Sequence, residues 1–286
     1  MKAVACERPT DRGRPLSRLS VFDVCQQVWA EGCRMSYSTI WRRLDEDALR
    51  PWFYRPWLFP RDPELLTKAG PVLELYHGRW QGKRLGPRDV VLSADELTQL
   101  QALSRSHSNE APRPGKTGRY EFEYERNGTL CYLAFLDVFS GRVYGETAPQ
   151  NGIEPFEAAL THCLEQERYR DAERVFLIVD NGCAHHPRTS PTRIPAQHPN
   201  VIPVHLPTHA SWLNQVELYF SILKRKALHP TDFPDTEALK QRIMHFQCRY
   251  NDDPQPFRWN YTRQDLAAHV KRLKERGWLP AKPLVN

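Results

Sequence analysis

Residues 175–182 read VFLIVDNG, five apolar residues followed at once by Asp180, Asn181 and Gly182. A short apolar run bounded by turn residues is typical of a strand buried on both faces. Residues 90–94, VVLSA, are a second mostly apolar run, and Asp95 follows them. Sites in α/β sheets gather at the carboxyl ends of such strands. The two runs therefore predict an α/β protein with Asp95 and Asp180 at candidate site positions.

Strand and helix patterns alternate around these two runs. Further strands are predicted over residues 120–124, 130–138, 142–146 and 201–206. Helices are predicted over residues 155–167, 211–228, 236–250 and 262–276. A meander of strands followed by alternating helices and strands is typical of a mixed sheet with flanking helices.

The first 50 residues have the pattern of two short helices around a Gly-containing break at residues 31–34. Ser20 can cap the first helix together with Asp23. This order is typical of a helix-turn-helix unit, whose second helix reads the major groove of DNA. That helix would present the side chains of Ser38, Thr39, Arg42 and Arg43. A small helical hairpin with a solvated basic face is the alternative.

Three parts of the chain are expected: a helix-turn-helix head over residues 1–50, a linker with a helix over residues 51–85, and an α/β domain over residues 86–280. The linker has four prolines within residues 51–63, which exclude a helix there. Its aromatic residues either pack on the protein, which we favour, or lie along DNA. The linker's helix is predicted over residues 62–78.

The charge of the chain is concentrated near its beginning. The net charge is +6, and residues 1–90 hold 16 Lys and Arg against 11 Asp and Glu, whereas the rest holds 24 against 23. A basic head on a nearly neutral body favours a polyanionic partner. No apolar run approaches the roughly 20 residues that span a bilayer. The seven scattered cysteines contain no Cys-x-x-Cys pair and indicate a reducing cytoplasm.

Glu217 is a third candidate carboxylate, beside the apolar stripe of the helix predicted over residues 211–228. Three carboxylates at one place would repel each other unless cations neutralise them. Mg²⁺ prefers carboxylate oxygens, and two such ions can stabilise both the attacking and the leaving oxygen in phosphodiester cleavage. With a basic head, this points to a metal-dependent nuclease or strand-transfer enzyme. Because aspartates at strand ends and glutamates in helices are common, the alternative is three acidic residues that do not converge.

Three blocks carry a resemblance to a known family: LSADE at residues 92–96, IVDNG at residues 178–182, and HLPTHASWLNQVE at residues 205–217. They resemble the blocks of DDE-type transposases, in the bacterial insertion-sequence branch of the Tc/mariner superfamily. Shorter matching stretches lie at residues 123–128, 152–156, 219–226 and 256–259. The similarity runs from about residue 13 to about residue 278, and the longest block is the most specific.

The resemblance implies a ribonuclease H-like domain with a mixed five-stranded sheet and flanking helices. Asp95, Asp180 and Glu217 would be catalytic and would hold two Mg²⁺ ions, for which Mn²⁺ can substitute. The protein would bind the terminal inverted repeats of its element as a homodimer, nick the DNA with a metal-activated water, and join the free 3′-hydroxyl to target DNA. It would act on the nucleoid in the bacterial cytoplasm, with no membrane contact. The alternatives are an inactive DNA-binding remnant and a nuclease without strand transfer.

Two departures from the family pattern accompany the resemblance. Relatives usually have two helix-turn-helix units, so we expect a shortened head here. Relatives often carry Lys after the Asp-Glu pair and Ser-Ser-His after Asp-Asn-Gly, whereas this chain has Leu97 and then Cys183-Ala184-His185.

Other residues have weaker expected roles. Supporting residues around the carboxylates are Asn181, His185, His209 and Asn214; for the histidines the alternatives are phosphate or water contacts and a plain structural role, since their spacing matches no zinc motif. Further DNA contacts are predicted at Arg113, Lys116, Lys224 and Arg225. A solvated loop is the alternative for the first two, and stabilisation of the helix C-terminus for the last two.

Overall fold

The computed structural model describes residues 1–54 and 62–277 and divides the chain into two units, Met1–Phe59 and Pro60–Asn286. A five-stranded sheet forms the centre of the second unit, in the order β5-β4-β3-β6-β7. Its strands are β3 (Asp89–Ser104), β4 (Glu125–Asp137), β5 (Val143–Ala148), β6 (Arg174–Val179) and β7 (Val201–His205). β3, β4 and β5 are antiparallel, whereas β6 and β7 run parallel to β3. The predicted mixed sheet is confirmed.

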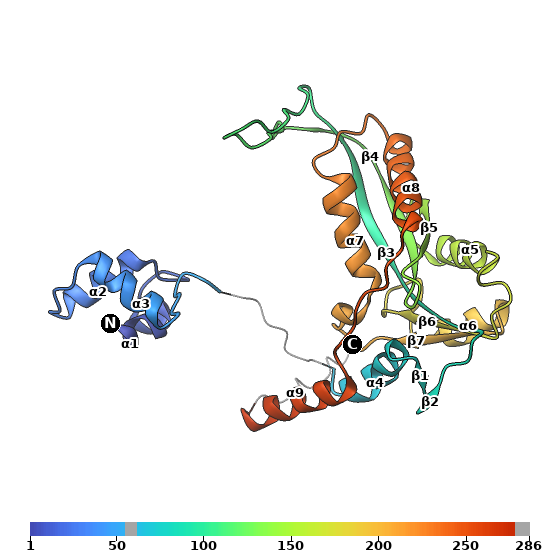
Figure 1. Cartoon of the computed structure of the whole chain (residues 1–286), viewed down its shortest axis with the longest axis horizontal. Helices are drawn as coiled ribbons and strands as arrows, with labels where there is room; N and C mark the ends of the chain where they lie inside the picture. Colours follow the sequence, from blue (N-terminus) through green and yellow to red (C-terminus); the bar gives the residue numbers. More distant parts are fainter. Residues whose placement is uncertain (55–61, 278–286) are drawn as a thin grey trace. The chain divides into compact units, whose positions relative to one another are not determined.

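Helices cover both faces of this sheet (Figure 1). α5 (Ile153–Leu164) and α6 (Ser190–Gln197) pack on one face, in a core that includes Leu92, Ala94 and Phe135. The opposite face is covered by α4 (Leu65–Tyr76), α7 (Val216–Leu223), α8 (Thr236–Asp252) and α9 (Arg263–Glu275). Successive residues of a strand point to opposite faces. Side chains of successive residues on β3 therefore pack against two different layers of helices.

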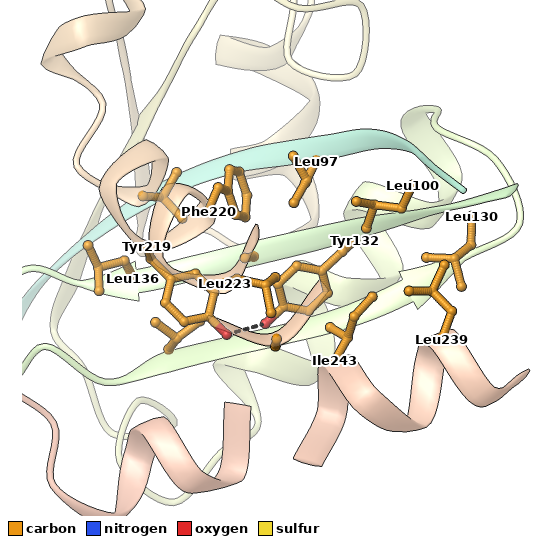
Figure 2. Close-up of a cluster of buried hydrophobic side chains, with 14 of the residues drawn as sticks. Leu97, Leu100, Leu130, Tyr132, Leu136, Tyr219, Phe220, Leu223, Leu239 and Ile243 are labelled. Carbon is orange, nitrogen blue, oxygen red and sulfur yellow. Dashed lines mark hydrogen bonds between the residues drawn. The ribbon is translucent and has the colours of Figure 1, made fainter. Parts of the chain in front are cut away.

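The core between β3, β4 and α7 also contains a polar contact (Figure 2). Tyr132 of β4 and Tyr219 of α7 are both fully buried, and their hydroxyls are 3.3 Å apart. The Tyr132 hydroxyl also donates a hydrogen bond to Gln247 of α8, at 2.5 Å. Hydroxyls in an apolar core are costly unless they find such partners. These bonds therefore fix α7 and α8 in one position against the sheet.

The first unit contains α1 (Lys2–Cys6), the 3₁₀ turn η1 (Pro9–Arg12), α2 (Val21–Ala30) and α3 (Tyr37–Glu46). Ser20 and Asp23 form the predicted reciprocal cap of α2, and the Ser36 side chain caps α3. A small core of Val24, Val28, Ile40 and Leu44 joins α2 to α3. The two predicted helices of the head are confirmed, and Ser38, Arg42 and Arg43 are exposed on α3 while Thr39 is half-buried.

Two predicted elements are wrong. Residues 120–124 form no strand; β3 and β4 instead extend into an arm whose tip has only two isolated bridges, Glu110–Arg119 and Arg113–Lys116. The helix predicted over residues 211–228 is interrupted at Asn214: the 3₁₀ turn η2 (Ser211–Leu213) precedes this residue, and α7 continues without a gap into the π-helical turn η3 (Lys224–Leu228). The backbone of Asn214 is extended, because its side chain forms hydrogen bonds with β3.

Several elements differ from the prediction in smaller ways. α6 and the short hairpin of β1 (Arg79–Trp80) and β2 (Lys83–Arg84) were not predicted. The helix predicted over residues 62–78 is observed as α4, and it packs in the same core as β6 and β7. Residues 55–61 of the predicted linker lie outside the described residues. None of the helices in the described ranges is long and apolar enough to cross a membrane.

Candidate active site

The register of the sheet brings Asp95 and Asp180 together. β3 and β6 are parallel, and the register that pairs Ser93 with Ile178 places Asp95 opposite Asp180, directly past the end of β6. Neighbouring strands are about 4.8 Å apart. Ligand atoms of Asp95, Asp180 and His185 all lie within 4.8 Å of one another, and no other such group of three occurs in residues 1–54 and 62–277.

The Asp95 carboxylate is 8% exposed and accepts two hydrogen bonds. Oδ1 accepts one from the backbone N–H of Glu96 at 2.8 Å, and Oδ2 accepts one from Nδ2 of Asn214 at 3.0 Å. Burial and the charge of Asp180, with smaller contributions from Glu96 and Glu217, raise the pKa of Asp95 to about 7. Burial and a neighbouring like charge both disfavour the charged form of a carboxylate.

Asn214 and Ser93 tie the start of α7 to β3. The amide of Asn214 also donates a hydrogen bond to the backbone oxygen of Ala94, at 3.0 Å. Ser93 Oγ donates to Asn214 Oδ1 and accepts from the backbone N–H of Val216, at 3.0 Å. Both side chains are buried. This network places Glu217 in the first turn of α7, where it is exposed and lies close enough to Asp95 to affect its pKa.

Glu217 is not one of the three residues whose ligand atoms meet within 4.8 Å. It is near the pair of aspartates, through its effect on Asp95, but it lies farther out. The sequence therefore predicted three carboxylates in one region, and the structure brings two of them into direct proximity.

The loop after β6 holds Asp180 through local hydrogen bonds. Oδ1 of Asp180 accepts a hydrogen bond from the backbone N–H of Gly182 at 2.6 Å, and Nδ1 of His185 lies 3.2 Å from the same oxygen. The side chain of Asn181 donates a hydrogen bond to the backbone oxygen of Leu206, the residue that follows β7. Within the described residues, no hydrogen bond reaches Oδ2 of Asp180. That oxygen is therefore free to bind a ligand.

His185 is completely buried and contacts acceptors through both ring nitrogens. Nδ1 lies 2.9 Å from the backbone oxygen of Asp180, and Nε2 lies 3.2 Å from Oε2 of Glu96. Burial alone would lower the pKa of His185, but the hydrogen bond to Glu96 and the charges of Glu96 and Asp180 raise it above its usual value. Each ring nitrogen thus lies within hydrogen-bond distance of an oxygen.

The sequence prediction missed Glu96 and Ser93. The available signal was the alternation of side chains along β3, which places Ser93 and Asp95 on the face of α7 and Glu96 on the face of α5. Asp95 and Glu96 are adjacent in the chain, but they belong to two separate hydrogen-bond networks.

The donor set fits a divalent cation. Asp95 and Asp180 offer carboxylate oxygens, which Mg²⁺ and Mn²⁺ prefer. Burial and the neighbouring charge of Asp180 raise the pKa of Asp95, and a bound cation would favour the charged form of this carboxylate. Both nitrogens of His185 are engaged in hydrogen bonds, so the two carboxylates are the better ligands.

The other residues with predicted roles are not members of this group. Arg113 and Lys116 are exposed at the tip of the arm, and Lys224 and Arg225 are exposed on η3. His209 is exposed with a left-handed backbone at φ 59°, and in the described parts of the chain no hydrogen bond joins it to the carboxylates. Ser38, Thr39, Arg42 and Arg43 belong to the other unit.

One family model matches more than half of the chain. The family model described as DDE superfamily endonuclease matches residues 90–240. No curated protein matches the chain. Among solved structures, the chain is similar to the mariner Mos1 paired end complex with Mg, at 12% identity and a TM-score of 0.50, covering 92% of this chain and 79% of that one.

Two other solved structures have similar values. The Mos1 mariner paired end complex with Mn is 14% identical, with a TM-score of 0.49, over 92% of this chain and 78% of that chain. The Mos1 strand transfer complex is 13% identical, with a TM-score of 0.47, over 92% and 77%. At these identities, the likeness concerns the fold, and the five-stranded mixed sheet with flanking helices is the ribonuclease H-like arrangement expected from the sequence.

Proposed function

Because the chain belongs to the DDE superfamily endonucleases, we propose that it is a transposase that cleaves DNA at element ends and joins these ends to target DNA. The observation that carries this proposal is the meeting of Asp95, within β3, and Asp180, just past the end of the parallel strand β6, with ligand atoms within 4.8 Å. Carboxylates in this arrangement are suited to hold a divalent cation next to a phosphodiester.

In this proposal, Asp95 and Asp180 hold the cation and Glu217 is the third catalytic carboxylate. Mg²⁺ or Mn²⁺, when bound, supplies an activated water and neutralises charge on the scissile phosphate. The hydrogen bonds of the protein orient the three carboxylates. Asn214 orients the Asp95 carboxylate, and the loop after β6 engages one oxygen of Asp180 so that the other faces outward. The Ser93–Asn214 bond sets the position at which α7 presents Glu217.

The basic side chains provide the proposed DNA contacts. Arg42 and Arg43 on α3, with Ser38 and Thr39, form the surface that would read the inverted repeats. Arg113 and Lys116 of the arm, and Lys224 and Arg225 of η3, would contact phosphates. We assign the protein to the bacterial insertion-sequence branch of its superfamily, acting on the nucleoid as a dimer that joins two ends. The similar Mos1 structure with Mg is a paired end complex, which supports a DNA partner.

The proposal is tested with purified protein, labelled DNA that carries the sequences flanking its gene, and Mg²⁺ or Mn²⁺. We expect metal-dependent nicks at the element ends and, with a target plasmid present, joined products. The Asp180→Asn variant should yield neither product. Identical products from the wild type and this variant would show that the proposed site is wrong.

Two outcomes identify the alternatives. Nicks without joined products would indicate a nuclease that lacks strand transfer. Specific binding of the end DNA without nicks, in either metal, would indicate a DNA-binding remnant.

A further inference from the structure

Glu96 is a buried carboxylate on the side of the sheet opposite Asp95. Its side chain is 5% exposed and packs in the layer of α5 rather than in the layer of α7. Oε2 lies 3.2 Å from Nε2 of His185. Oε1 is buried and has no hydrogen-bond partner among the described residues.

The unpaired oxygen of Glu96 carries a cost in stability. A buried acceptor without a partner destabilises a fold, and an apolar pair of similar volume is often as stable as a buried charged pair or more so. The neighbours of Glu96 on this face, Ala94 and Leu92, are apolar and packed.

His185 connects Glu96 to Asp180. Its ring packs against Phe156 of α5, with 5.1 Å between the ring centroids. Its backbone oxygen accepts a hydrogen bond from Ser190 Oγ at 3.0 Å. The ring is therefore fixed by packing, and its Nδ1 side faces the backbone oxygen and Oδ1 of Asp180, at 2.9 and 3.2 Å.

We infer that Glu96 and His185 are positioning residues, a buried pair that orients the Asp180 carboxylate from the α5 face of the sheet. Glu96 fixes the His185 ring, and the ring holds Oδ1 of Asp180 together with the Gly182 amide. Oδ2 would then be the oxygen available to a cation. Asn214 holds Asp95 from the α7 face, so the two aspartates are supported from opposite faces of one sheet. The inference rests on the proposed function, in which Asp180 is a metal ligand.

The test compares full-length variants of the pair: Glu96→Gln, Glu96→Leu, His185→Leu and the double variant Glu96→Leu/His185→Leu. His186→Leu is the matched control, because His186 is the exposed neighbour of His185. Three quantities are measured: the melting temperature, the hydrogen exchange rate of the Gly182 amide in metal-free protein, and the affinity for Mn²⁺ by calorimetry.

We expect Glu96→Gln to bind Mn²⁺ as the wild type does, because glutamine retains an acceptor for His185. The control His186→Leu should also bind Mn²⁺ as the wild type does. Each leucine variant should bind Mn²⁺ about 10–100-fold more weakly, the usual effect of removing a group that orients a ligand. The double variant should lose no more affinity than the single variants, since the two residues act as one unit. The melting temperature of the double variant should return to the wild-type value, whereas its Gly182 amide hydrogen should still exchange faster than in the wild type.

A double variant with wild-type Mn²⁺ affinity and wild-type protection of Gly182 would overturn the inference. The failure of the proposed function has a different signature. If Asp180→Asn binds Mn²⁺ as well as the wild type does, the proposed metal site is wrong. The exchange of Gly182 in metal-free protein still reports whether Glu96 and His185 hold the loop.

Discussion

Asn214 donates a hydrogen bond from Nδ2 to Oδ2 of Asp95 at 3.0 Å, although the two residues are 119 positions apart in the chain. The same amide group donates to the backbone oxygen of Ala94, and Ser93 donates to the amide oxygen of Asn214. All the polar atoms of the Asn214 side chain are thus used inside the protein. Asn214 interrupts the helix before Glu217 and connects the two segments that carry Asp95 and Glu217.

Removal of the Asn214 amide should destabilise the second unit. In Asn214→Ala, the buried oxygen of Ala94 and the hydroxyl of Ser93 lose a partner, and such losses each cost about 1–3 kcal/mol. We expect the free energy of unfolding, measured by urea denaturation, to fall by at least about 2 kcal/mol. Asn109→Ala, at an exposed position of the arm, is the control. Equal stability of the two variants would contradict the role of this network.

The stability of the metal-free protein should depend on pH through Asp95. Its pKa is about 7 in the folded protein and about 4 in the unfolded chain, so the folded state retains its proton over a range where the unfolded chain releases it. The resulting stabilisation is complete below about pH 4 and is lost as the pH rises to about 7, a total of at most about 4 kcal/mol. Urea denaturation of the wild type and Asp95→Asn between pH 4 and 8 measures it. A constant difference between them would refute it.

Cation affinity should depend on pH in the opposite direction. Mg²⁺ or Mn²⁺ competes with the proton on Asp95, so the affinity should rise up to tenfold per pH unit below about pH 7 and level off above it. Calorimetry in two buffers of different ionisation enthalpy would detect the released proton. Binding that is independent of pH between 6 and 8 would argue against Asp95 as the ligand.

Glu217 should be needed for activity and dispensable for folding. It is exposed in the first turn of α7, where an acidic residue contributes less than about 1 kcal/mol. Glu217→Gln should therefore unfold nearly as the wild type does and show no nicking. Glu237→Gln, in the first turn of α8, is a matched exposed control that should remain active. An active Glu217→Gln protein would remove Glu217 from the proposed site.

The head should bind DNA through α3. Arg42→Ala and Arg43→Ala change exposed side chains, so both variants should fold. The logarithm of the DNA-binding constant falls linearly with the logarithm of salt concentration. The magnitude of this slope should be smaller by about 1 for each phosphate that a variant no longer neutralises. Arg8→Ala, an exposed arginine elsewhere in the head, should retain the wild-type slope. Equal slopes for all three variants would exclude α3 as the DNA-binding helix.

Local patterns predicted the elements whose signals are local. The apolar run before Asp180 predicted β6, and Ser20 with Asp23 predicted the start of α2, because burial and capping depend on residues close in the chain. The alternating residues at 120–124 predicted a strand that is absent, because no neighbouring strand pairs with them. The break in the helix at Asn214 was missed for the same reason, since its partners lie on β3.

The sequence by itself determined that Asp180 follows a buried strand of an α/β sheet, and it identified the family through its three blocks. The prediction that a strand also ends at Asp95 is wrong, because β3 continues through Asp95 to Ser104 in its pairing with β4. Only the tertiary structure decided that β3 and β6 are neighbours in a register that places these two aspartates side by side. Only the tertiary structure showed that Asp95 and Glu96 lie on opposite faces of one strand. It also showed that Asn214 binds Asp95 and that His185 binds Glu96. The physical reason is that strand pairing and hydrogen bonds between distant segments depend on how the whole core packs, which no local pattern records.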